Sequence, residues 1–410
     1  MKRISGMLFA AAIAATIPLV ANAADMKAEV LHWWKSGGES AAIKEIADRF
    51  KAAGGEWIDT AIAGGEQARA AGINRIIGGN PPTVMQFNTG KQFEELVANG
   101  FLTPLTKVAE ANKWKDILPK AIVDAASRDG QFYAAPVNIH GQNWLWYNVD
   151  VLKKAGVEPP KTFGDILAIA PKLKQAGVIP FAHGAQDWQD AILFVAVLVA
   201  EGGKDVFQKV YGEADAKAVQ SAGFRKAAET YAALRLLADE GSAGRNWNDT
   251  TGLVITGKAA MQLMGDWAKG EFINAKMTPG KEYGCVVMPG GYVMGGDVFV
   301  FPKVKDAAHL AAQAKMAELM LSPETQIAFN TKKGSVPVRL DLDVSAMDAC
   351  AQAGMKALKD PAQQVPSDNY ISSPDRVGAL RDVITQFWSN KSMTVDDFVA
   401  KIITALKSAS

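Results

Sequence analysis

The feature that most constrains the fold is a regular alternation of short apolar runs and amphipathic stretches that begins at Glu29. EVLHWW (29–34) predicts a first strand, and apolar residues at i, i+3, i+4 and i+7 from Ile43 to Phe50 predict the helix after it. Further strands are expected at 57–62 and 83–88, with a helix between them. Units of this length are typical of parallel crossovers and indicate an open α/β lobe with a mainly parallel sheet.

Two adjacent tryptophans, Trp33 and Trp34, stand where the first strand ends. Sheets of this kind bind ligands beyond the carboxyl ends of their strands, so these indoles lie where a crevice is expected. Because neighbouring strand residues point to opposite faces, we expect one indole in the crevice and the other in the core. Ser36 and Glu39 fit a capping box for the next helix, which would bring Glu39 close to any ligand there.

The N-terminus predicts a secretory signal peptide, residues 1–23. Lys2 and Arg3 precede an apolar run from Met7 to Val20, and Ala21-Asn22-Ala23 matches a cleavage site. Removal of the two basic residues changes the formal net charge from +1 to −1, so no long-range field favours nucleic acid or an acidic membrane. We therefore expect a protein outside the cytoplasm with an uncharged or locally recognised partner.

The mature chain of 387 residues is longer than one hydrophobic core usually supports, which predicts two lobes. Residues 131–148 read as a strand that leaves the first lobe, and mainly helical segments follow. Strand character returns at 257–268 and 295–304, so each lobe is expected to be discontinuous. We assign 24–137 and 263–318 to an N-terminal α/β lobe, and 138–262 and 319–410 to a mainly helical C-terminal lobe.

The two cysteines, Cys285 and Cys350, leave two alternatives open. In an oxidising compartment they can form a disulfide or remain two buried thiols, and sequence does not supply the geometry that decides between them. No histidine stands near either one in the sequence, which disfavours a thiol enzyme.

Common catalytic motifs are absent from the sequence. It has no H-E-x-x-H, C-x-x-C, G-x-S-x-G or G-x-G-x-x-G, and its four histidines lack metal-ligand spacing. The segment 252–259, GLVITGKA, has phosphate-loop spacing as far as Lys258 but then has Ala259, which offers no hydroxyl to magnesium. We interpret it as a coincidence. Carboxylate pairs suited to glycoside hydrolysis remain an open alternative, since any chain with 43 acidic residues contains some.

Tryptophans beside polar residues are the most informative chemical signal. The sequence has ten tryptophans, many next to Asp, Asn or Lys, as at Trp188, Trp247 and Trp267. An indole offers an apolar face to the C–H surface of a pyranose, while carboxylates, amides and ammonium groups bind its hydroxyls. The pattern favours carbohydrate binding, although packing in the core or between lobes is the commoner explanation for any single tryptophan taken alone. For Trp33 and Trp34 the crevice position makes the two explanations equal.

Six motifs in this order give a specific resemblance: EVLHWWKSGGE, GGNPPTVMQF, YAAPVNIHGQNWLWYN, MQLMGDWAKGEF, GGDVFVFPK and NTKKGSVPVR. Together they resemble the periplasmic sugar-binding proteins of bacterial ABC importers, in the family-one extracellular solute-binding group, glucose- and mannose-binding type. The resemblance covers nearly the whole mature chain. It implies a periplasmic binding protein fold, with two α/β lobes joined by hinge strands and a sugar between them.

The resemblance also implies site residues. Trp33, Trp34 and Glu39 correspond to the first sugar-contact segment of the family. Asp297 and Lys333 match later polar contacts, Trp267 matches a second aromatic wall, and either Asn88 or Lys91 supplies a contact. His140 is a sugar ligand, a hinge hydrogen-bonding residue or a satisfied buried imidazole. No contact motif is recognisable after Asp341.

The function implied is that of a binding protein which closes on a monosaccharide, an aldohexose such as glucose, and presents it to an inner-membrane permease with a separate ATPase. We expect a monomer without catalytic residues, metal or cofactor, and without nucleic acid as a partner. Two rival hypotheses are a secreted carbohydrate hydrolase or lyase and the ligand-binding component of a sugar sensor.

Overall fold

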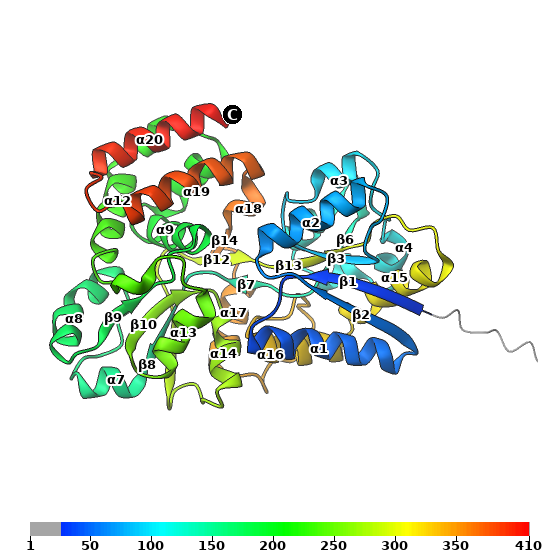
Figure 1. Ribbon diagram of the computed structural model, residues 1–410, viewed down its shortest axis with the longest axis horizontal. Helices are drawn as coiled ribbons and strands as arrows, with labels where there is room; N and C mark the ends of the chain where they lie inside the picture. The colour runs from blue at the N-terminus through cyan, green and yellow to red at the C-terminus, as the bar shows by residue number, and fades with distance from the viewer. Residues whose placement is uncertain (1–25, 410) are drawn as a thin grey trace, which may run out of the picture.

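The computed structural model describes residues 26–409 and has two lobes (Figure 1). The predicted signal peptide lies outside the described residues. The first lobe is built on a five-stranded sheet in the order β2-β1-β3-β13-β6. Its strands are β1 (Met26–His32), β2 (Gly55–Ala61), β3 (Val84–Asn88), β6 (Ala134–Pro136) and β13 (Asp297–Val300). β1 is parallel to β2 and β3, as predicted, whereas β13 is antiparallel to both β3 and β6.

Helices cover this first sheet and define its core. They are α1 (Gly37–Ala52), α2 (Gly65–Ile77), α15 (Ala307–Met320) and α16 (Pro323–Lys333). The apolar side of α1 buries Ile43, Ile46 and Phe50, as its spacing predicts, and α1 packs along α16. Helix α15 packs against β1. Because β1 and β3 are parallel, their carboxyl ends lie at the same edge of this sheet.

The second lobe has a four-stranded sheet in the order β11-β8-β10-β9 and many helices. The strands are β8 (Trp144–Asn148), β9 (Ile179–Ala182), β10 (Ala259–Met264) and β11 (Tyr283–Val287). The principal helices are α8 (Phe163–Gln175), α9 (Asp187–Glu201), α12 (Ala222–Leu234), α13 (Trp247–Ile255), α19 (Pro374–Ser389) and α20 (Val395–Ser408). Helices α9, α12, α19 and α20 pack together through the rings of Phe194, Tyr231, Phe387 and Phe398.

Short elements complete both lobes. The helices are α3 (Glu94–Ala98), α4 (Thr106–Ala111), α5 (Trp114–Ile117), α6 (Lys120–Ala126), α7 (Val149–Lys154), α10 (Gly203–Phe207), α11 (Ala216–Val219), α14 (Ala268–Asn274), α17 (Ala349–Lys359) and α18 (Asp368–Ile371). A π-helix covers Gln208–Gly212, a 3₁₀-helix covers Glu240–Ser242, and β4 (Ser127–Arg128) pairs with β5 (Gln131–Phe132). No helix among the described residues is long and apolar enough to cross a membrane.

A three-stranded sheet lies where the chain passes between the lobes. It consists of β7 (His140–Gly141), β12 (Tyr292–Gly295) and β14 (Gln364–Pro366), in the order β14-β12-β7. β7 follows β6 and precedes β8, while β12 connects β11 to β13, so these strands join the two larger sheets (Figure 1). The structure thus has discontinuous lobes joined by hinge strands.

Two segments lie in different lobes from those that the sequence predicted. β11 falls within 263–318, assigned to the first lobe, but it pairs with β8 in the second sheet. α16 falls within 319–410, assigned to the second lobe, but it packs against α1 of the first. The reason is physical: apolar pattern identifies a strand or helix, but its partner is chosen by packing between residues far apart in sequence.

The cysteines form a disulfide, which decides between the two alternatives. Cys285 of β11 and Cys350 of α17 are bonded, with Cα atoms 6.2 Å apart and a sequence separation of 65. The bond therefore fastens the second sheet to the segment that follows α16.

We predict that reducing this disulfide lowers the free energy of unfolding by roughly 2–4 kcal/mol, because the unfolded chain gains the entropy of an open loop. Guanidinium denaturation with and without dithiothreitol measures the change. A Cys285→Ser/Cys350→Ser variant should be as stable as the reduced protein and insensitive to dithiothreitol. Equal stability of the oxidised and reduced wild-type proteins would contradict the prediction.

Candidate ligand-binding site

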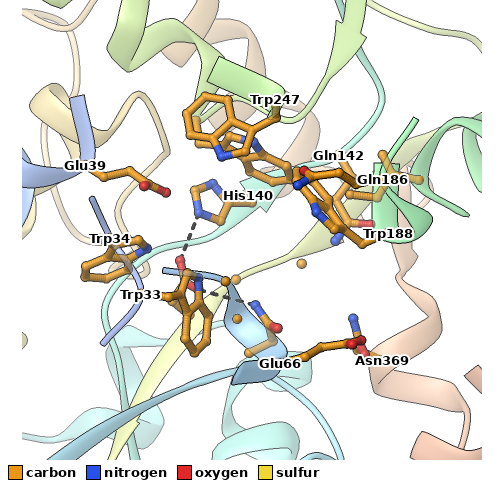
Figure 2. Close-up of a pocket in the computed structure, with 18 of the residues that line it drawn as sticks. Trp33, Trp34, Glu39, Glu66, His140, Gln142, Gln186, Trp188, Trp247 and Asn369 are labelled. Carbon is orange, nitrogen blue, oxygen red and sulfur yellow. Dashed lines mark hydrogen bonds and ion pairs between the residues drawn. The ribbon is translucent and has the colours of Figure 1, made fainter. Parts of the chain in front are cut away.

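A cavity of about 430 Å³ lies between the lobes and is lined by side chains from both. The first lobe contributes the ends of β1, β3 and β13 and the starts of α1 and α2. The second contributes the starts of α9 and α13, and the hinge contributes His140. Figure 2 shows Trp33, Trp34 and Glu39 across the cavity from Trp188 and Gln186, with His140 between them and Trp247 above in the view. The volume is in the range typical of small-molecule sites.

The two adjacent tryptophans divide their roles as expected. β1 ends at His32, so both residues have already left the strand. Trp33 is partly buried and lines the cavity, and its backbone N–H donates to Gln86 Oε1 at 3.1 Å. Trp34 is only 2% exposed and packs against Phe299 and Phe329. The Trp33 indole therefore forms part of the cavity wall. The Trp34 indole lies mainly in the core, although it also borders the cavity.

Glu39 forms the capping box that the sequence predicted and also lines the cavity. The capping box with Ser36 is formed, since the Glu39 amide donates to Ser36 Oγ and Glu39 Oε2 accepts from the Ser36 amide. Its other oxygen, Oε1, lies 3.1 Å from Lys333 Nζ in a buried ion pair. Lys333 Nζ in turn stands over the rings of Trp34 and Trp267, at 5.4 and 6.0 Å. Glu39 at the start of α1 and Lys333 at the end of α16 thus place a carboxylate and an ammonium group side by side at the cavity wall.

His140 joins two carboxylates at the cavity. Its Nδ1 contacts Asp266 Oδ1 and its Nε2 lies 3.0 Å from Asp297 Oδ2. Burial disfavours a charged ring, but the two carboxylates outweigh burial and raise the pKa of His140 above its ordinary 6.5. Burial likewise opposes the charge of Asp297, yet His140, Lys333 and Asn138 together lower its pKa. The arrangement is a buried imidazole between two carboxylates, whose charges favour its protonated form.

The remaining predicted residues lie as follows. Trp267 lines the cavity, with its ring perpendicular to His140 at 4.9 Å and 6.2 Å from Trp188. Asn88 also lines it, and its Nδ2 donates to Asp297 Oδ1 at 3.4 Å. Lys91 does not: its backbone N–H donates to Asn369 O, and its side chain does not line the cavity. Of the two alternatives in this segment, Asn88 at the carboxyl end of β3 is the one that lines the cavity.

Sequence reasoning missed two groups of lining residues. One is in the second lobe, at the starts of α9 and α13: Gln186, Trp188, Asn246, Trp247 and Asn248. The tryptophan-beside-polar pattern includes Trp188 and Trp247, so a signal existed. The other is in the C-terminal segment: Ser367, Asp368, Asn369 and Arg381. Ser367, Asp368 and Asn369 lie at the start of the four-residue helix α18, and Arg381 lies on α19, in a part of the sequence where no motif marks a contact.

An arginine links the lobes at the cavity. Arg381 of α19 forms ion pairs with Glu66 of α2 and with Asp187 of α9, the latter at 3.5 Å. Arg69, which follows Glu66 by one turn, lies 5.7 Å from the Trp33 ring, and burial lowers its pKa to about 10. The charges of Glu66 and Asp187 are therefore compensated within the protein.

Phosphate and metal chemistry find no support in the geometry. In the segment with phosphate-loop spacing, α13 comes first and β10 follows a turn at Gly257, which is the reverse of a strand-loop-helix cradle. Among residues 26–409, no cluster of three or more His, Cys, Asp or Glu side chains is placed to hold a metal ion.

The fold and the cavity define a class: a two-lobed protein that binds a small solute between its lobes. The family model described as bacterial extracellular solute-binding protein matches residues 34–327. The chain is 36% identical to a probable sugar-binding periplasmic protein of Mesorhizobium japonicum, covering 98% of this chain and 99% of the relative. It is 32% identical to an ABC transporter extracellular-binding protein of Pyrococcus horikoshii, over 92% of this chain and 87% of that one. The protein therefore belongs to the bacterial extracellular solute-binding protein family.

Solved structures agree with this fold. A chitin oligosaccharide binding protein superposes with a TM-score of 0.78 and 20% identity, covering 93% of this chain and 98% of its own. A bacterial solute receptor described as selective for β-D-galactopyranose gives 0.78 and 18%, covering 94% of this chain and 97% of its own. At these identities the likeness shows the fold alone. The family and the periplasmic names of the relatives confirm the predicted periplasmic location.

We predict that stability falls as pH rises above 6.5. A group whose pKa is raised by folding contributes stability that is complete below its unfolded pKa and is lost as pH rises through its folded pKa, and His140 is such a group. The free energy of unfolding, measured by denaturation from pH 6 to 10, should decline over this window, and His140→Gln should flatten the decline.

His309, on α15 and away from the cavity, provides the matched control. His309→Gln should retain the wild-type dependence on pH. A wild-type profile that stays level above pH 6.5, or one that His140→Gln leaves unchanged, would show that the imidazolium between Asp266 and Asp297 does not stabilise the fold.

Proposed function

We propose that this protein is the periplasmic substrate-binding component of an ABC-type sugar importer. It binds a monosaccharide, an aldohexose such as glucose, between its lobes and delivers it to an inner-membrane permease. Energy comes from a separate ATPase, and the protein acts as a monomer. The observation that carries this proposal is the cavity, in which partly buried indoles from both lobes stand beside carboxylate, amide and ammonium groups.

The arrangement suits a pyranose. Trp33 and Trp247 offer apolar ring faces from opposite lobes, while Glu39, Asp297 and Lys333 offer acceptors and a donor for hydroxyl groups. Closure then follows from differential affinity, because only the closed arrangement satisfies a ligand from both lobes at once. The names of relatives and neighbours support sugars as a class, since they include a xylose/arabinose-binding protein and complexes with tagatose and raffinose.

A carbohydrate hydrolase is less well supported. It requires a protonated carboxyl as general acid and a second carboxylate at a fixed separation. Glu39 forms an ion pair with Lys333, and Asp297 is paired with His140, which lowers the pKa of Asp297 and disfavours it as a general acid. Burial raises the pKa of the Asp368 carboxyl, as a general acid requires. The binding experiment therefore includes a check for reaction products.

We predict tight one-to-one binding of one monosaccharide in isothermal titration of the sugar-free protein with glucose, mannose, galactose, xylose, trehalose and maltose. Trp33→Ala should weaken binding about tenfold, because a stacking surface is lost. Trp34→Ala should lower the free energy of unfolding by about 3–5 kcal/mol, because it leaves a cavity in the core.

Trp57→Ala is the control, since Trp57 lies on β2 of the same lobe and does not line the cavity. Its affinity should equal that of the wild type. Absence of heat with every sugar, unchanged affinity in Trp33→Ala, or hydrolysis of an added disaccharide would each contradict the proposed function.

A further inference from the structure

Three helices that begin at the cavity lack the side-chain cap that the other long helices have. The described residues contain eleven helices of nine or more residues, and in eight of them a Ser, Thr or Asp side chain accepts a hydrogen bond from a first-turn amide. The exceptions are α2, α9 and α13. Their N-cap residues, Gly64, Gln186 and Asn246, all line the cavity.

Local structure explains why each of these three helices lacks a side-chain cap. Gly64 has φ +88°, a conformation that side-chain-bearing residues rarely adopt, so this position excludes a capping side chain. Asn246 is a residue type that usually caps, but its Oδ1 accepts instead from Gln186 Nε2 at 3.2 Å. Gln186 is thereby held as well, and its own Oε1 accepts from Gln189 Nε2 at 2.8 Å.

The orphan amides lie in the cavity wall. Helix N–H groups point toward the N-terminus, and the first-turn residues Gly65, Trp188 and Asn248 themselves line the cavity. The other long helices have side-chain caps. Three missing caps at one site therefore indicate that local helix stability is reduced there for the sake of function.

A buried hydroxyl group independently points to a ligand in the same cavity. Ser367 is 0% exposed and lines the cavity, and its hydroxyl oxygen has no hydrogen-bond partner among the described residues. Thr89, which is 1% exposed and also lines the cavity, has its hydroxyl group beside that of Tyr370. Buried polar groups are normally paired, so the Ser367 hydroxyl indicates a polar ligand.

The charges nearby decide which chemistry the amides bind. A helix N-terminus carries about half a positive charge and by itself favours an anion. Here each first turn also holds a carboxylate: Glu66 in α2, Asp187 in α9 and Asp249 in α13. Arg381 pairs with Glu66 and Asp187, and Arg69 interacts with Glu66, so these two cations compensate two of the three carboxylates and leave a negative charge. That remaining charge disfavours an anion, and the amides are suited to neutral acceptor oxygens.

We infer that the first-turn amides of α2, α9 and α13 are ligand-binding groups that donate hydrogen bonds to neutral hydroxyl or ring oxygens of the bound sugar. They are left uncapped because the ligand caps them. The inference rests on the proposed function and deepens it: the substrate is a neutral polyhydroxylated sugar, not a sugar acid or sugar phosphate, and it is held from both lobes by backbone as well as side-chain groups.

The test compares Gln186→Ser with Gln186→Ala. Both variants lose the hydrogen bond to Asn246, but only serine can cap α9 by accepting from the Trp188 amide. Gln186→Ser should therefore have the higher Tm of the two in the absence of sugar. It should also bind the sugar about fivefold more weakly than Gln186→Ala, which corresponds to one hydrogen bond. Opposite effects on stability and affinity distinguish this role from a purely structural one.

Thr394 supplies the control, because it caps α20 far from the cavity. Thr394→Ala should lower Tm and leave affinity unchanged. Titration with glucuronate and glucose 6-phosphate should give weaker binding than glucose. Equal affinities of the two Gln186 variants, or tighter binding of the anions, would overturn this inference while leaving the proposed function intact. If no sugar binds the wild type, the proposed function fails and the inference with it.

Discussion

The imidazole of His140 connects the two lobes at the cavity, and the geometry of the site depends on it. Asp266 follows the last strand residue of β10 in the second sheet, and Asp297 is the first residue of β13 in the first sheet. His140 lies between them on hinge strand β7. Two buried carboxylates so close would repel each other, and the imidazolium reverses that interaction. The same bridge orients Asp297, whose Oδ1 accepts from Gln86 and Asn88.

The two lobes supply different elements to the cavity wall. In the first lobe, Glu39 at the start of α1 is fixed by a capping box and an ion pair with Lys333, and Trp33 adds an indole. In the second lobe, the cavity wall is formed by the starts of α9 and α13, with their tryptophans. A sugar held between these walls has an indole and hydrogen-bonding groups on each side. Neither lobe alone completes the site, which is the physical basis for closure on a ligand.

Sequence predicted the parts of the structure that depend on local pattern. Periodicity placed α1 and its buried face, and the end of the first strand placed Trp33 at the crevice, whereas Asn88 and Asp297 were expected there from the family resemblance. It failed where partners are distant. The lobe of β11 depends on pairing with β8 across more than a hundred residues, and the disulfide depends on a contact that spacing does not encode. Ser367 reaches the cavity through tertiary packing of a short segment without a motif.

The most direct test of this account is a crystal structure of the protein grown with glucose or with whichever monosaccharide gives the largest heat. The account predicts one pyranose in the cavity, in contact with Trp33, Glu39, Asp297 and Lys333, with oxygens at the first-turn amides of α2, α9 or α13. Sugar density outside the cavity, or a charged solute in its place, would contradict the central claim that the cavity between the lobes is a neutral-sugar site.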